Sequence, residues 1–153
     1  IDLGIVPIRY GLAKSIVGSK VHQLAQHETL KQAFKTNQED VSFEDALKRI
    51  GGVVVKSSEL SLIIESTKLN GQTKMIDRPG TIPKGWLPEG ANCPCIYSLS
   101  LTTNADVYPL FTISIPKVEI PGLTKPISTQ VNAVSTWENL GRDPSTGEFF
   151  INE

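Results

Sequence analysis

Apolar residues recur at helical spacing in the first quarter of the chain. One face is formed by residues three or four positions apart, namely Ala13, Val17, Val21 and Leu24. A second, partly overlapping stripe contains Leu12, Ile16, Leu30 and Phe34. Together they predict a helical region over Ile8–Phe34, about 40 Å long if unbroken. The stripe drifts around the axis near Gln26–Thr29, which indicates a bend or a second short helix there.

Another short helix is predicted after the polar link Thr36–Asp40. Ser42 is a favourable N-cap residue, and Glu44-Asp45 in the first turn suits the positive end of a helix dipole. Its apolar face would contain Phe43, Ala46, Leu47 and Ile50. Gly51-Gly52 would end the helix.

Alternation of apolar and polar residues then predicts strands, beginning with the β-branched run Val53–Val55. Asn70-Gly71 separates Glu59–Leu69 from Gln72–Ile76. Both turn residues tolerate positive φ, so a β-hairpin is expected here. Residues 77–95 are rich in Pro and Gly and predict a long loop, pinned to the body by Trp86 and Leu87.

The rest of the chain is predicted to be rich in strands. These are expected over Ile96–Thr103, Val107–Ile115, Lys117–Ile120 and Pro126–Trp137, with a short final strand at Phe149–Ile151. We therefore expect an α+β fold: a long N-terminal helix plus a short helix, packed on a mostly antiparallel sheet of at least five strands. It would form a single domain over residues 1–153, divided into helix region 1–36, short helix and hairpin 37–76, loop 77–95 and strands 96–153.

Composition narrows the function classes. The 153 residues are 39% hydrophobic and 20% charged, as in a compact domain. Fifteen Lys and Arg against 16 Asp and Glu, with no basic stretch, argue against nucleic-acid binding. No run approaches the roughly 18 apolar residues that span a bilayer. The chain begins at Ile1 rather than Met, so we expect a processed product or a fragment, with any membrane attachment through a segment before Ile1.

Only Pro94 separates the two cysteines, Cys93 and Cys95. Two thiols with no His nearby cannot supply a four-ligand zinc site. The spacing also differs from the Cys-x-x-Cys of thioredoxin-like sites. Two interpretations stay open: a pair of reduced thiols, or a disulfide that closes a very small ring and would suit an oxidising compartment.

No catalytic motif stands out. His22 and His27 lie about 140° apart on a helix, so they cannot share a metal and are expected to be solvated. Ser114–Lys117 matches the bare Ser-x-x-Lys pattern, but its proline prevents the helical turn that this chemistry needs. Asp143–Gly147 is expected to be a plain turn. We therefore predict no catalytic, cofactor-binding or metal-binding residues, and a protein that is not an enzyme.

The C-terminal third carries a family resemblance. Leu99–Thr102 and Val107–Phe111 precede Ile120–Leu123, and the strand Ile127–Ser135 then ends at Trp137-Glu138. In this order of segments the chain resembles the soluble region of type IV pilin-like proteins, most nearly the TadE-like pseudopilins of tight-adherence (Flp) pili. The resemblance implies a pilin-like fold and a non-enzymatic minor subunit that primes or caps a pilus, or joins its assembly platform. It also implies other protein subunits as partners and an extracytoplasmic location at the cell surface, in a pilus or in the periplasm.

Candidate subunit contacts follow from the residues themselves. A helix with two apolar stripes can bury one and present the other, which makes Leu12, Ile16 and Val17 candidates, with ordinary core packing as the alternative. Trp86 and Trp137 are candidate partner anchors, because Trp is favoured at binding hot spots. Loop-pinning is their alternative role.

Two other function classes remain open. One is a secreted adhesin or ligand-binding module that uses the loop Gly80–Cys95 as its contact surface. The other is an extracytoplasmic hydrolase with an acidic pair, which would need a carboxyl group of raised pKa in a pocket.

Overall fold

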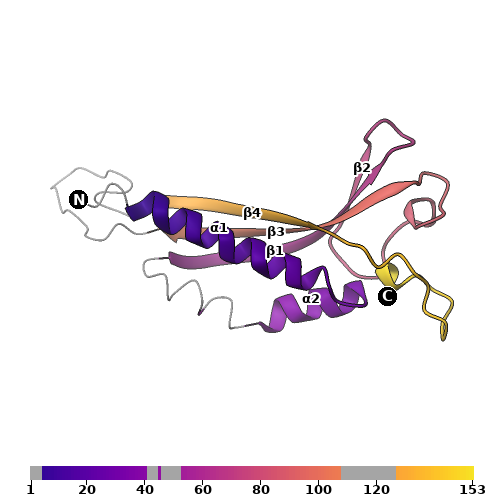
Figure 1. Cartoon of the computed structure of the whole chain (residues 1–153), viewed down its shortest axis with the longest axis horizontal. Helices are drawn as coiled ribbons and strands as arrows, with labels where there is room; N and C mark the ends of the chain where they lie inside the picture. The colour runs from indigo at the N-terminus through magenta and orange to yellow at the C-terminus, as the bar shows by residue number, and fades with distance from the viewer. Residues whose placement is uncertain (1–4, 41–44, 46–52, 108–126) are drawn as a thin grey trace. The chain divides into compact units, whose positions relative to one another are not determined.

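The computed structural model describes residues 5–40, 45, 53–107 and 127–153. Its helices are α1 (Ile5–Leu24) and α2 (Leu30–Glu39), and its strands are β1 (Val53–Ser66), β2 (Thr73–Ile76), β3 (Cys95–Val107) and β4 (Ile127–Thr136). Two single-turn 3-10 helices, η2 (Lys84–Trp86) and η3 (Phe150–Asn152), lie in the connections. The fold is α+β, with two helices packed on a four-stranded antiparallel sheet in the order β2-β1-β3-β4 (Figure 1).

The chain divides into two compact units, which are described separately below. Unit 1 comprises Ile1–Ser19, Asp40–Glu59 and Thr102–Ala133. Unit 2 comprises Lys20–Glu39, Leu60–Leu101 and Val134–Glu153. Residues of α1, β1, β3 and β4 belong to both units.

The predicted hairpin is confirmed, but its strands stop short of the turn, with β1 ending at Ser66 rather than Leu69 and β2 beginning at Thr73 rather than Gln72. β1 and β2 pair antiparallel, with Leu62 opposite Ile76 and Ile63 opposite Met75. Asn70 and Gly71 both have positive φ, 51° and 80°, as the turn chemistry requires.

The helical region is broken, as the drift of the apolar stripe near Gln26–Thr29 indicated. Thr29 Oγ1 accepts a hydrogen bond from the Gln32 backbone N–H, and the Gln32 side chain accepts one from the Thr29 N–H. This reciprocal pair is a capping box, which starts α2 as a new helix. The expected long N-terminal helix, about 40 Å over Ile8–Phe34 if unbroken, is therefore wrong.

In unit 1, α1 packs on the sheet through small side chains. Ala13 and Val17 of α1 are buried, together with Val53, Ala105, Val107 and Val131 of the strands. A Cβ added at Gly18 would lie 4.0 Å from the Ala133 Cβ, so helix and strand approach closely here. Figure 1 shows this part of α1 running alongside β4.

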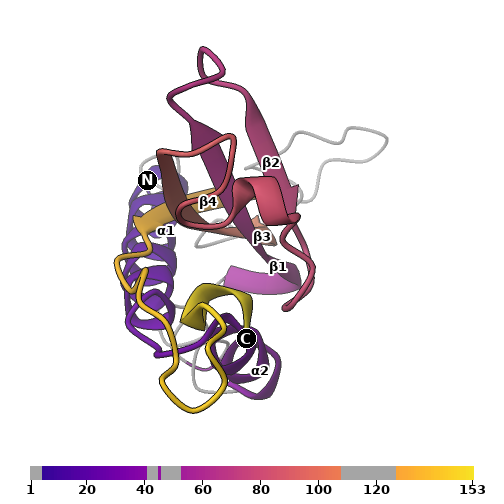
Figure 2. The ribbon, with the colours of Figure 1, turned by 90° about the vertical axis from the view of Figure 1, so that its right-hand side faces the viewer.

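In unit 2, larger side chains form the core. The fully buried ones are Leu24, Leu30, Leu62, Ile64, Leu99, Leu101, Trp137 and Ile151. Helix α2 lies beside the C-terminal turn η3, where the Lys31 N–H donates to the Glu153 carbonyl at 2.8 Å (Figure 2).

Several other predicted elements are wrong or lie outside the described residues. The strand expected at Phe149–Ile151 is wrong: Phe149 forms a single bridge with Arg142, and the chain then enters η3. The described part of the sheet has four strands, not the expected five or more. The predicted strand Lys117–Ile120 lies outside the described residues, as does almost all of the short helix from Ser42 and of the strand Val107–Ile115.

Core burial makes a direct prediction about stability. Leu62 is fully buried, so Leu62→Ala is expected to lower the free energy of unfolding by about 2–5 kcal/mol, through lost transfer energy and the cavity left behind. Chemical denaturation followed by circular dichroism measures this change. The same substitution at Leu12, which is 48% exposed, serves as the control and should cost less than about 1 kcal/mol. Equal losses at the two positions would contradict the burial described here.

Candidate functional site

The strands of unit 2 have one covered face and one open face. Leu62 and Ile64 of β1 point to the covered face, where His22 of α1 meets Ser135 of β4. Successive strand residues point to opposite sides of a sheet. Ile63 and its cross-strand partner Met75 therefore lie on the open face.

Four apolar side chains share this open face: Ile63, Met75, Ile96 and Val134. Met75 is 68% exposed, Val134 56% and Ile96 49%. We call these four residues the apolar face. Single exposed apolar residues need no explanation, whereas a contiguous apolar patch can mark a contact with a partner.

The apolar face was not among the sequence-based candidates, although a signal for it was present. In Leu62-Ile63-Ile64 the central residue is apolar where alternation calls for a polar one. The hairpin register then places Met75 beside it.

In unit 1, polar side chains on neighbouring strands form hydrogen bonds with each other. Asn104 donates to Ser57 at 2.8 Å, and Asn132 donates to Thr102 at 2.8 Å. Asp106 accepts from Ser128 at 2.9 Å and lies 3.4 Å from the Lys56 ammonium. Since these groups satisfy one another, this surface has a different character from the apolar face of unit 2.

A separate cleft of about 640 Å³ lies in unit 2. Its polar lining includes His22, Gln26, His27, Glu28, Ser135 and Glu138. The Nδ1 atom of His22 lies 3.4 Å from the Ser135 hydroxyl, and the Nε2 atom lies 3.1 Å from the Gln26 amide nitrogen. Both histidines line this cleft, with His22 exposed to solvent, as expected, and His27 half-buried. Within the described residues, no group of three or more His, Cys, Asp or Glu side chains is placed to hold a metal ion.

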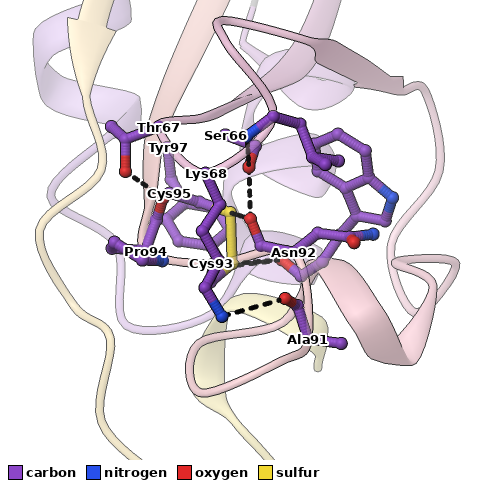
Figure 3. The surroundings of a disulfide bond; sticks show 11 residues. Ser66, Thr67, Lys68, Ala91, Asn92, Cys93, Pro94, Cys95 and Tyr97 are labelled. Atoms are coloured by element: carbon purple, nitrogen blue, oxygen red, sulfur yellow. Dashed lines mark hydrogen bonds between the residues drawn. A yellow bond between two sulfur atoms is a disulfide. The ribbon is translucent and has the colours of Figure 1, made fainter.

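The structure joins Cys93 and Cys95 in a disulfide at the end of the Pro/Gly loop (Figure 3). The loop that carries the disulfide is bonded to the end of β1 and to the turn that follows it. The side chains of Ser66, Thr67 and Lys68 donate to backbone carbonyls of this loop. The Tyr97 hydroxyl lies 3.3 Å from the Cys93 sulfur and donates to the Trp86 carbonyl at 2.6 Å. Burial raises the pKa of Tyr97 to about 12.

The five candidate subunit contacts divide by burial. Leu12 is exposed, and Ile16 and Trp86 are half-buried, so their contact role remains a prediction. Val17 is 0% and Trp137 1% exposed, so both belong to the core and present no surface to a neighbour. Trp137 does not need a partner for its polar atom, because its indole N–H donates to the Asn139 carbonyl at 2.9 Å.

Comparison with known proteins found no matching family model, no matching curated protein and no matching solved structure. Among the helices of the described residues, none is long and apolar enough to cross a membrane.

The buried phenol of Tyr97 should make stability depend on pH. An unfolded tyrosine titrates near pH 10, so the contribution of the neutral phenol is complete below that pH and is lost as the pH rises toward 12. The difference in Tm between the wild type and Tyr97→Phe should therefore be constant up to about pH 10 and then narrow. Thermal unfolding at a series of pH values measures it. Parallel curves for the two proteins throughout would count against a raised pKa.

Proposed function

We propose that this chain is a non-enzymatic structural subunit, a pilin-like minor component of an extracytoplasmic pilus or secretion assembly. The observation that carries the proposal is the apolar face of unit 2. Met75 and Ile63 stand directly opposite each other on it, and Met75 keeps 68% of its surface exposed. Contact with a neighbouring subunit would bury this apolar surface, which is favourable by about 25 cal/mol for each Å² removed from water.

The order of elements is consistent with this role. An N-terminal helix precedes an antiparallel sheet and packs on it, which fits the resemblance to TadE-like pseudopilins in the C-terminal third. Leu12 of α1 remains 48% exposed while Ala13 and Val17 are buried. The helix thus has one side in the core and a further apolar position for a neighbour.

The proposed location rests on the cysteine pair. Disulfides persist in oxidising compartments such as the periplasm and the cell surface, and are rare in the cytosol. The bond between Cys93 and Cys95 therefore favours an extracytoplasmic site.

A ligand-binding module is the second candidate, favoured by the cleft at His22 and Ser135. Its volume of about 640 Å³ is within the usual range for small-molecule sites. On this alternative the purified chain binds a soluble ligand in the cleft and does not need the apolar face.

The proposed role as a subunit is tested by introducing a charged residue into the apolar face and expressing the variant in the native host. Surface filaments are sheared from cells, and the amount of this chain in the filament fraction is measured by immunoblot. Met75→Asp should reduce that amount at least about tenfold, because a carboxylate would be buried without a partner at the contact.

Gln72→Asp is the matched control. Gln72 is also exposed and lies just before β2 in the same hairpin, outside the apolar face, so its filament fraction should equal that of the wild type. A chain that never co-purifies with filaments, or one in which both variants behave alike, would refute the proposal. Turnover of a substrate by a chain that is absent from filaments would support the hydrolase alternative instead.

A further inference from the structure

The disulfide Cys93–Cys95 is a poor staple, because it closes a loop that contains only Pro94. A cross-link stabilises a protein mainly by removing freedom from the unfolded chain, and this gain grows with the length of the closed loop. The two cysteines are only two residues apart, so the loop is very short and the stabilisation gained from closing it is small. The bond therefore contributes little to holding unit 2 together.

Hydrogen bonds already hold the backbone that carries the bond. The Thr67 N–H and hydroxyl both donate to the Pro94 carbonyl, at 3.0 and 2.8 Å. The Ser66 hydroxyl donates to the Asn92 carbonyl, and the Lys68 ammonium donates to the Ala91 carbonyl at 3.4 Å. Figure 3 shows these donors on one side of the loop. None of these bonds involves sulfur, so opening the disulfide leaves them intact.

The two sulfur atoms have different surroundings. Cys93 is only 8% exposed, and its sulfur lies 3.3 Å from the Tyr97 hydroxyl and 3.5 Å from the Trp86 carbonyl. Cys95 is half-buried, and its sulfur lies 3.7 Å from the Asn92 carbonyl oxygen. Cys95 is thus the sulfur that an incoming thiolate reaches first, and Cys93 is the sulfur that leaves.

We propose that Cys93–Cys95 is a thiol–disulfide exchange site, opened and closed by an external thiol while unit 2 stays folded. The thiolate attacks the Cys95 sulfur, forms a mixed disulfide with it, and the electron pair of the broken bond leaves on Cys93. A second thiolate attacks the external sulfur of the mixed disulfide and releases Cys95 as a thiolate. Two external thiols are oxidised to their disulfide, and the two cysteine thiolates take up two protons.

Tyr97 positions the leaving sulfur. Its hydroxyl donates to Trp86 while the disulfide is intact, and the Cys93 sulfur becomes a second acceptor once it carries charge. Since its pKa is about 12, the phenol keeps its proton throughout the range in which thiols exchange. Removal of this donor should shift the equilibrium toward the disulfide without changing the fold.

The first experiment asks whether exchange occurs in the folded protein. The whole chain is equilibrated with defined mixtures of reduced and oxidised glutathione, free thiols are blocked with N-ethylmaleimide, and intact mass counts them. Both cysteines should become reduced together while the far-ultraviolet circular dichroism stays unchanged. Reduction that requires denaturant, or that removes the dichroism signal, would overturn the proposal.

The second experiment tests the assigned order of the two sulfurs. Cys93→Ser leaves Cys95 alone, and Cys95→Ser leaves Cys93 alone as the matched control. Oxidised glutathione should modify the first variant at least about tenfold faster, because accessibility and thiolate character control exchange rates. Equal rates, or a faster Cys93, would overturn the assignment.

Two further arms distinguish the source of the thiol and the part of Tyr97. Faster reduction by a thioredoxin-type protein dithiol than by glutathione supports a protein partner, and the reverse order supports a small thiol. Tyr97→Phe should lower the fraction of reduced protein at a fixed glutathione ratio by about threefold or more, whereas a purely structural role would leave that fraction unchanged.

Discussion

The register of the β1–β2 hairpin governs the architecture of unit 2. The hairpin, closed by the turn at residues 67–71, pairs Leu62 with Ile76 and Ile63 with Met75. Because side chains alternate across a strand, a shift of one residue would move the whole buried set to the open face. The same turn therefore decides both which side chains fill the core and which stand on the apolar face.

Ser66 connects that hairpin to the disulfide loop. It is fully buried, its backbone N–H and carbonyl bond to Gln72 and Gly71 across the turn, and its hydroxyl donates to the Asn92 carbonyl. Thr67 extends the connection to Pro94. The loop is thus held by the hairpin from outside, which leaves the sulfur–sulfur bond free for a role other than support. The proposed assembly surface and the proposed exchange site adjoin in the chain, because Ile96 directly follows Cys95 in β3.

Local patterns anticipated the elements that depend on neighbours in sequence. The hairpin turn was predictable because Asn and Gly accept positive φ at no cost to the strands. The break between the helices was indicated by the drift near Gln26–Thr29, although the capping box of Thr29 and Gln32 went unnoticed. The final strand at Phe149–Ile151 failed, because a short apolar run does not distinguish a strand from a buried 3-10 turn.

Sequence by itself determined the α+β class and the existence of the hairpin, since both follow from the spacing of apolar residues and from turn chemistry. It did not determine the register, because a two-residue turn would pair Leu69 with Gln72, whereas the longer turn at residues 67–71 leads Glu65 to pair with Thr73. Only the tertiary structure decided which individual side chains are buried and which distant residues they contact. It buried Trp137, brought His22 to Ser135 across 113 positions, and surrounded the Cys93 sulfur with Tyr97 and Trp86. The physical reason is that burial and polar contacts depend on which distant segment packs against a residue, and periodicity within one segment carries no information about that partner.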